Sequence, residues 1–216
     1  MLNSLDAYAQ WAAAYPPHAH NALMRAEEAA LVSLLPSLKG RTVLDLACGS
    51  GRYAQMAYAR GASRVIGIDN SPHMLEQAHI QHRVLASLHS IPLVKQSVDV
   101  VISGLALGHI PDLGIALAEI ARVLGDGGVA LISDVHPCLF LGGAQRTFSV
   151  AGQTLAVEHH IHLYSDYHTA AAAAGLQIDR ILEPRLLPED APAGPPAPVA
   201  TIYRMTKRNH SPASVL

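Results

Sequence analysis

Short apolar runs alternate with amphipathic segments along the central part of the chain. Five of these runs are rich in β-branched residues and continuously apolar, which is typical of parallel strands buried on both faces. They cover Thr42–Ala47, Arg64–Asp69, Arg83–Ala86, Val98–Ser103 and Gly128–Val135. Helical patterns lie between them, over Gly51–Arg60, Pro72–His82 and Asp112–Leu124. Repeated β-α-β units of this kind predict an α/β fold with a doubly wound, mostly parallel sheet and helices on both faces.

The N-terminal part of the chain lacks this alternation. Met1–Leu35 predicts two helices separated at Tyr15-Pro16-Pro17, because prolines disrupt the interior of a helix. The first helix carries three aromatic side chains, Tyr8, Trp11 and Tyr15, at approximately helical spacing. We therefore expect an aromatic face on this helix, available either for core packing or for contact with a ligand.

The segment after the fifth strand, Cys138–Tyr164, also departs from the β-α rhythm. Within it, Thr147–Val150 and Thr154–Val157 flank Ala151-Gly152 and predict a β-hairpin. Residues 138–164 are therefore expected to form an insertion beside the sheet.

The C-terminal part predicts one more helix and two more strands. The helix covers Ser165–Ala174, and the strands Leu176–Glu183 and Val199–Lys207 flank a proline-rich loop, Pro184–Pro198. We expect one domain over residues 1–207 and a disordered tail over 208–216.

Composition narrows the class of protein. The 216 residues are 50% hydrophobic and 15% charged, which suits a large buried core. The sequence has no apolar run long enough for a transmembrane helix, and Met1–Gln10 lacks the features of a signal peptide. Two cysteines do not make a disulfide framework, so we expect a cytoplasmic protein without a membrane partner. A net charge of -2 without a basic stripe argues against nucleic acid as a partner.

Two apolar runs each end in a carboxylate, in VLDLACGSG with Asp45 and in RVIGIDNS with Asp69. Ligands of open parallel sheets bind outside the carboxyl ends of the strands, so both acids and the intervening glycine loop are expected to line one crevice. The loop also satisfies G-x-G-x-x-A over Gly49–Ala54, a weak dinucleotide signal. Asp45 would repel a diphosphate there, whereas a ligand with an ammonium and a sulfonium, such as S-adenosylmethionine, gains from its charge.

The motifs together resemble the class I S-adenosylmethionine-dependent methyltransferases, specifically the small-molecule "type 11" group. The resemblance covers roughly Arg41–Pro137, through VLDLACGSG, RVIGIDNS, SVDVVISGLALGHI and GGVALISDVHP in the family's order. It implies a Rossmann-like sheet of seven strands whose last strand is antiparallel, and a helical lid over residues 1–36. It also implies S-adenosylmethionine as cofactor and S-adenosylhomocysteine as product.

The resemblance further implies roles for individual residues. Asp45 and the loop around Gly49 would hold the methionine portion, and Asp69 would bind the ribose hydroxyls. The full expected cofactor set is Tyr15, Asp45, Ala47, Gly49, Gly51, Tyr53, Asp69, Asn70, Met74, Ser87, Leu88, Gly104 and Leu105. Two positions depart from the family pattern, because Ala47 replaces a frequent first glycine and Ser87 replaces a frequent aspartate.

Histidines are the candidates for acid-base chemistry. His136 follows the fifth strand, so we expect it to project into the crevice near the transferred methyl group as a general base, with His109 as second candidate. No metal site is expected, although His159, His160 and His162 follow the hairpin. The expected acceptor contacts are Tyr8, Trp11, His20, Arg146, Phe148, His160, Tyr164 and Tyr167.

The function expected from these observations is methyl transfer to an oxygen or nitrogen of a small, partly hydrophobic metabolite. We expect the enzyme to act in secondary metabolism and to be a monomer or homodimer. Three alternatives stay open at this point. They are a non-methylating S-adenosylmethionine enzyme on the same fold, a nicotinamide-dependent oxidoreductase disfavoured by Asp45, and a non-catalytic cofactor-binding partner.

Overall fold

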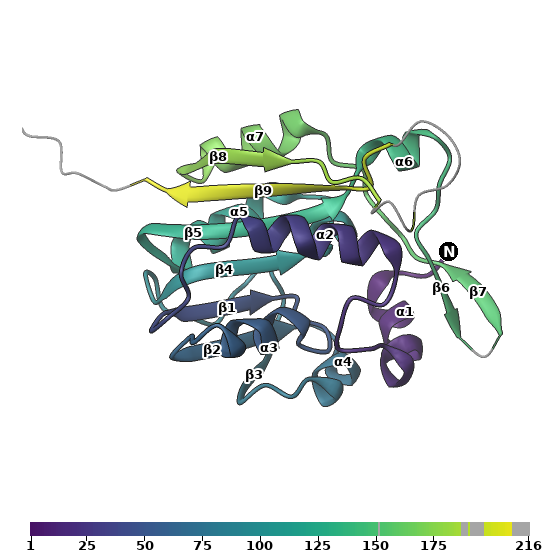
Figure 1. The fold of residues 1–216 in the computed structure, drawn as a ribbon, viewed down its shortest axis with the longest axis horizontal. Helices are drawn as coiled ribbons and strands as arrows, with labels where there is room; N and C mark the ends of the chain where they lie inside the picture. The colour runs from purple at the N-terminus through teal and green to yellow at the C-terminus, as the bar shows by residue number, and fades with distance from the viewer. Residues whose placement is uncertain (151, 187–189, 191–196, 209–216) are drawn as a thin grey trace, which may run out of the picture.

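A seven-stranded sheet forms the centre of the protein in the computed structural model, which describes residues 1–150, 152–186, 190 and 197–208 (Figure 1). The strand order is β3-β2-β1-β4-β5-β9-β8. The strands are β1 (Thr42–Leu46), β2 (Arg64–Asp69), β3 (His82–Leu85), β4 (Val98–Gly104), β5 (Leu124–Val135), β8 (Leu176–Leu182) and β9 (Ala200–Lys207). The pairs from β3 through β5 are parallel, whereas β9 is antiparallel to both of its neighbours. The predicted α/β fold with an antiparallel last strand is confirmed.

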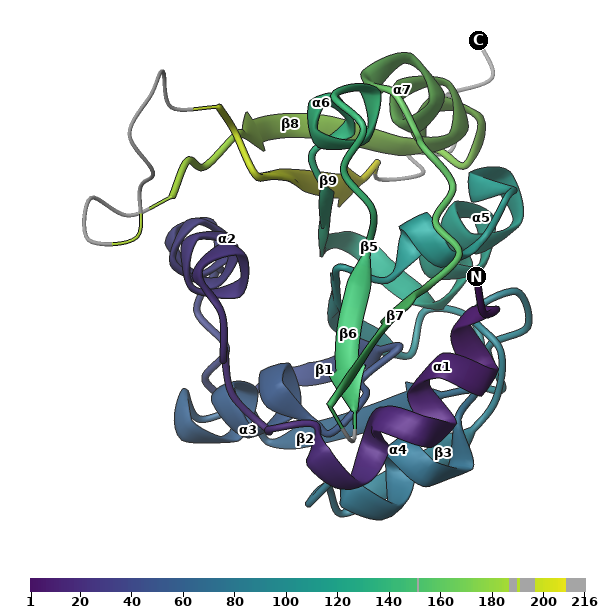
Figure 2. The same ribbon diagram turned by 90° about the vertical axis from the view of Figure 1, so that its right-hand side faces the viewer.

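Helices cover both faces of this sheet (Figure 2). On one face α2 (Ala22–Ser33) and α3 (Arg52–Ala59) pack against a core that includes Leu31 and Ala57. On the other face α5 (Leu113–Val123) and α7 (Tyr164–Ala173) bury residues such as Leu117. Most strand residues are buried, which explains why their apolar runs do not alternate.

The fourth helix is shorter than its sequence pattern suggests. We expect Pro72–His82, but α4 covers Pro72–Gln77 and the chain turns extended at Ala78. The side chain of Arg83 donates to the carbonyl oxygens of Leu75 and Ala78, which satisfies the end of the helix. The early end also allows Ile80 to pack into the core, where its side chain lies directly over Gly51, in the loop after β1, and over Gly67 of β2.

Two further differences concern the fifth strand and the segment after it. The strand β5 begins at Leu124 rather than Gly128, because its pairing with β4 continues across a register shift near Val98. A short helix, α6 (Pro137–Leu141), follows directly, with the His136 side chain at its N-cap. The sequence pattern does not predict this helix.

The N-terminus and the insertion pack together beyond the carboxyl ends of the parallel strands (Figures 1 and 2). Helix α1 (Ser4–Trp11) leads into a 3-10 turn over Ala12–Ala14. The predicted hairpin is present as β6 (Thr147–Val150) and β7 (Gln153–Ala156). Leu2 bridges Val157, and a small core joins the two segments.

Some expectations fall on residues that the structure does not describe. The turn residue Ala151, part of the proline-rich loop and the tail from residue 209 lie outside the described residues. Arg208, the first residue of the expected tail, donates its backbone N–H to the Gly175 carbonyl. Within the described part of the chain, no helix has the length and apolarity needed to span a membrane.

Candidate functional site

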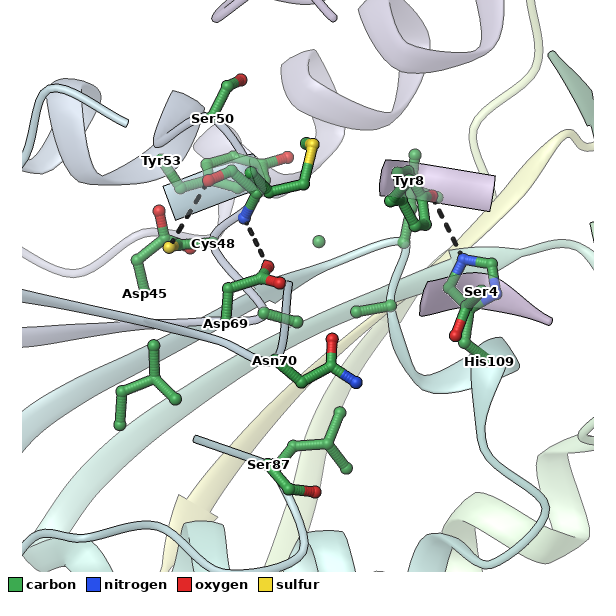
Figure 3. A pocket seen from close by; sticks show the side chains of 18 of the residues that line it. Ser4, Tyr8, Asp45, Cys48, Ser50, Tyr53, Asp69, Asn70, Ser87 and His109 are labelled. Atoms are coloured by element: carbon green, nitrogen blue, oxygen red, sulfur yellow. Dashed lines mark hydrogen bonds between the residues drawn. The ribbon is translucent and has the colours of Figure 1, made fainter. Parts of the chain in front are cut away.

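A pocket opens at the carboxyl ends of β1, β2 and β4, beneath α1 (Figure 3). Every residue expected to contact the cofactor lines this pocket except Gly51. Of the residues expected to contact the acceptor, Tyr8 and Arg146 line it, and so does His109. The pocket therefore brings together residues that span most of the chain length, from the N-terminal helix to the insertion.

The loop between β1 and α3 folds tightly against the pocket. Gly49 and Gly51 have φ values of 54° and 88°, in the left-handed region that favours glycine. Ala47 also has a positive φ, 56°, although it has a side chain. Gly51 stands just before α3, as its N-cap. The loop thus exposes its backbone to the pocket at the start of α3. At the beginning of the loop, Ala47 is strained.

Asp69 ties the end of β2 to this loop. One carboxylate oxygen accepts a hydrogen bond from the Gly49 backbone N–H and the other from the Ser71 N–H, each at 2.8 Å (Figure 3 shows the Gly49 bond). Burial raises the pKa of this carboxyl, and the backbone donors oppose that shift. Asp69 is therefore held rigidly at the pocket wall by bonds that favour its ionised form.

Asp45 is buried in the middle of the same wall. Its Oδ2 accepts a hydrogen bond from the Ala54 N–H in the first turn of α3, at 2.8 Å. Burial raises the pKa of Asp45 to about 7, and the neighbouring charge of Asp69 adds to the shift. Neither carboxylate forms an ion pair with any described side chain. The pocket thus holds two acids without a cation of their own.

A buried glutamate behind the pocket was not predicted from the sequence. Glu27 of α2 is fully buried, and its Oε1 accepts hydrogen bonds of 2.5 Å from the Tyr53 and Ser133 hydroxyls. Its Oε2 accepts from the Arg52 guanidinium at 3.0 Å, and Arg52 also pairs with Glu28. The signal was available, because Glu27 lies on the same stripe of α2 as the buried Met24 and Leu31.

This network fixes the Tyr53 ring against the end of β4. A Cβ atom added to Gly104 would lie 2.3 Å from Tyr53 Cε2, so only glycine fits beneath the ring. Burial raises the pKa of Tyr53 well above its ordinary value, and the nearby Glu27 carboxylate adds to this effect. Tyr53 is accordingly a neutral hydrogen-bond donor that shapes the pocket floor.

The opposite end of the pocket is formed by α1, the turn after β4 and the insertion. The Tyr8 hydroxyl lies 3.2 Å from His109 Nε2, and Arg146 donates to the same hydroxyl at 3.0 Å. The other His109 nitrogen lies 3.1 Å from the Glu158 carbonyl oxygen. Burial, with the charge of Arg146 beside it, lowers the pKa of His109 to about 2. His109 is therefore a neutral imidazole.

Several expected acceptor contacts form an aromatic cluster behind the pocket rather than its lining. Trp11 stacks on Phe148 with ring centroids 5.1 Å apart, and its ring edge contacts Tyr15 and His20. Among these four only Tyr15 lines the pocket. The expected contact of Trp11, His20 and Phe148 with the acceptor is corrected, because none of them lines the pocket: Trp11 and Phe148 join α1 to the hairpin, and His20 packs against Trp11 and Tyr15.

The expectation that His136 projects into the crevice is wrong. His136 caps α6, and its Nε2 lies 2.8 Å from the Tyr164 hydroxyl and 2.9 Å from Glu183 Oε1. Its Nδ1 lies 2.8 Å from Cys138 Sγ. The start of α6 turns the ring away from the pocket and toward β8, so both His136 and Tyr164 lie outside the pocket lining.

Tyr167 and His160 also lie outside the pocket lining. Tyr167 is buried in the core, where it donates to Asp134 at 2.9 Å and stacks on Tyr203. His160 faces Glu158 at 3.6 Å. Among the described residues, no three histidine, cysteine or acidic side chains are grouped so as to hold a metal ion.

Two features of this structure are relevant to the class of protein. One is a seven-stranded sheet with an antiparallel last strand, and the other is a pocket at the carboxyl edge of the sheet, lined by glycines and two acids. Residues 44–132 match the methyltransferase domain family. The match assigns this segment, which runs from β1 to β5, to the methyltransferase domains.

Individual relatives agree with this assignment. A malonyl-[acyl-carrier protein] O-methyltransferase from Serratia marcescens is 31% identical over 159 residues, which are 70% of this chain and 60% of that protein. A Mesorhizobium loti S-adenosylmethionine-dependent methyltransferase has a similar structure, with a TM-score of 0.70 and 23% identity over 84% of this chain and 97% of its own.

A geranyl diphosphate C-methyltransferase from Streptomyces coelicolor A3(2), solved with S-adenosylhomocysteine, has a TM-score of 0.64 at 17% identity. That similarity covers 85% of this chain and 80% of the solved one. The two structural likenesses concern the fold, and the chain spans less than two thirds of the length of the curated relatives it matches.

Proposed function

We propose that the protein transfers a methyl group from S-adenosylmethionine to a small, partly hydrophobic metabolite. The observation that carries this proposal is the pair of carboxylates, Asp45 and Asp69, which share one pocket and form no ion pair with any residue that the structure describes. A ligand with an ammonium group and a sulfonium offsets exactly this kind of charge, whereas a diphosphate would be repelled. The acids therefore favour this cofactor over a nicotinamide dinucleotide.

The residues present fit the cofactor. The glycine loop allows close approach of a ligand to the backbone, and Asp69 is oriented to accept hydrogen bonds from ribose hydroxyls. Asn70 and Met74, which line the pocket, would lie near the adenine, and Gly104 and Leu105 would lie beside the sulfonium. When bound, S-adenosylmethionine supplies a methyl group already activated for transfer by its positive sulfur.

Rate acceleration would come chiefly from positioning the acceptor. Holding a nucleophile in line with the methyl carbon at near-attack distance can account for most of the barrier reduction. His109 is a neutral imidazole at this end of the pocket, and its lowered pKa makes it a weak base. We therefore assign His109 and Tyr8 to orienting the acceptor, and His136 to the structure around α6.

The acceptor itself is proposed only as a class. The Serratia relative is named for an O-methyltransferase activity on malonyl-[acyl-carrier protein], and the Streptomyces protein for a C-methyltransferase activity on geranyl diphosphate. These names differ in acceptor and in acceptor atom, so they support methyl transfer rather than one substrate. Action in the cytoplasm on a secondary metabolite, by a monomer or homodimer and without nucleic acid, belongs to the same proposal.

Calorimetric titration tests the cofactor assignment. We expect S-adenosylhomocysteine to bind and NADH to give no measurable heat at the same concentrations. The Asp69→Ala variant should weaken S-adenosylhomocysteine binding more than tenfold, because a ribose acceptor is lost. Tighter binding of NADH than of S-adenosylhomocysteine would overturn the proposal in favour of an oxidoreductase.

A further inference from the structure

Arg146 is the charged residue that the insertion contributes to the pocket. It precedes β6, and its side chain reaches across the pocket mouth. One guanidinium nitrogen, Nη2, donates to the Tyr8 hydroxyl at 3.0 Å and to the Leu105 carbonyl oxygen at 2.9 Å. The side chain thus joins α1, the end of β4 and the insertion at the point where all three meet the pocket.

The second guanidinium nitrogen is left without a partner. Arg146 Nη1 is buried and has no hydrogen-bond partner in the described structure. Arg146 also forms no ion pair with a described acid. Burial raises the pKa of Asp134, and the charge of Arg146 opposes this rise. The two Asp134 oxygens nevertheless accept hydrogen bonds from Tyr167 and Val135 rather than from Arg146.

Charge in the pocket is therefore divided between its two ends. Figure 3 shows Asp45 and Asp69 on one side, and Tyr8 with His109 on the other. The second cation of the lining, Arg52, is already paired with Glu27 and Glu28. A buried donor without a partner is costly, and an anion placed on it removes that cost.

We propose that the acceptor carries a carboxylate and that Arg146 holds this group, an inference that rests on the proposed function. Because both hydrogens of Nη2 are already donated, Nη1 is the nitrogen that remains to form a charge-assisted hydrogen bond with one oxygen of a carboxylate. The neighbouring Tyr8 and His109 side chains are neutral, so they compete neither with the Arg146 guanidinium nor with the acceptor carboxylate. Because Arg146 donates to the carbonyl of Leu105, which we place beside the sulfonium, the carboxylate would sit close to the transferred methyl group.

Hexanoate and hexanamide, which differ in charge and share an apolar tail, are suitable probes. Each is titrated by calorimetry into protein saturated with S-adenosylhomocysteine. We expect hexanoate to bind at least about tenfold more tightly than hexanamide, as a charge-assisted hydrogen bond from Arg146 Nη1 would give. In Arg146→Met, which keeps an unbranched apolar stem and removes the charge, this difference should vanish. Arg64→Met is the matched control, since Arg64 is exposed at the start of β2.

The outcomes separate the two proposals. Failure of S-adenosylhomocysteine to bind the wild-type protein would reject the proposed function itself. Normal cofactor binding with equal or absent affinity for the two probes would reject only the carboxylate assignment, even if Arg146→Met did not fold. A large loss of S-adenosylhomocysteine affinity in a folded Arg146→Met would assign Arg146 to the cofactor's own carboxylate. Tighter binding of hexyl phosphate than of hexanoate would assign Arg146 to a phosphate group. Either result would overturn the inference.

Discussion

The Tyr53 hydroxyl donates a 2.5 Å hydrogen bond to the fully buried carboxylate of Glu27, which links the first turn of α3 to the middle of α2. The same carboxylate pairs with Arg52, so one side chain from the N-terminal segment fixes two residues that line the pocket. The cofactor pocket is therefore supported by a helix that precedes the β-α repeat.

Replacing Glu27 with glutamine should destabilise the protein. The substitution leaves the buried Arg52 guanidinium facing an amide, and breaking a buried pair costs about 3–5 kcal/mol. We expect a loss of about 3 kcal/mol in the free energy of unfolding by urea denaturation, with weaker S-adenosylhomocysteine binding. The control is Glu28→Gln, because Glu28 is partly exposed and such pairs contribute about 0–1 kcal/mol. Equal effects of the two substitutions would contradict this account.

Cofactor affinity should depend on the ionisation of Asp45. The pKa of Asp45 is raised to about 7 by burial, and the ammonium group that S-adenosylmethionine and S-adenosylhomocysteine share favours the carboxylate form. Below pH 7 the free protein holds a proton that must leave on binding, so S-adenosylhomocysteine affinity should fall by up to about tenfold for each pH unit. Titrations across this range measure the effect, and Asp45→Asn should bind weakly with little pH dependence.

Asp45 should also couple stability to pH. Because its folded-state pKa lies above the ordinary value of aspartate, its protonated form stabilises the fold at low pH. This contribution is lost as the pH rises through about 7. We expect Asp45→Asn to melt at a higher temperature than the wild-type apoprotein at pH 8, with a smaller difference near pH 5. A variant that is less stable at both pH values would contradict the shift.

His109 should remain neutral throughout the physiological range. Burial and the adjacent charge of Arg146 lower its pKa to about 2. Its ring proton resonances should therefore not move between about pH 5 and 8. An NMR titration of specifically labelled histidine measures this. A midpoint near 6.5 for His109 would restore it as a candidate general base.

Ala47 offers a stabilising substitution at the site. Its φ of 56° is unfavourable for a residue with a side chain. Ala47→Gly should therefore raise the free energy of unfolding by about 1 kcal/mol, while leaving S-adenosylhomocysteine affinity within about twofold of wild type. Differential scanning calorimetry and titration report the two quantities separately. A lower melting temperature would show that the flexibility of glycine in the unfolded chain outweighs the relief of strain.

The sheet could be predicted from the sequence because its signals are local. Buried parallel strands give continuous apolar runs, and Asp45 and Asp69 end two of them at the same edge. The position of the glycine loop followed from the same reasoning, whereas the rest of the expected cofactor set came from the family resemblance. Of that set, Gly51 alone is not among the described residues that line the pocket. Even the hairpin was found, because β6 and β7 are joined through a glycine turn.

The contacts outside the sheet depend on how segments pack, which the sequence pattern does not specify. His136 directly follows β5, but α6 turns it toward Glu183. Trp11 and Phe148 belong to segments outside the sheet that were expected to contact the acceptor, yet they stack on each other. The apolar stripe of α2 indicates that Glu27 is buried, but its hydrogen bonds depend on how α3 and β5 pack against α2.

The parts that would choose an acceptor come from two distant stretches of the chain, α1 and the β6–β7 hairpin, joined by Leu2, Val157 and the Trp11–Phe148 stack. Both stretches lie outside residues 44–132, the part shared with the methyltransferase domain family. Exchanging only one of them with a relative would break their common core. Acceptor preference in this protein should therefore be transplanted as a matched pair of segments, leaving the cofactor-binding sheet unchanged.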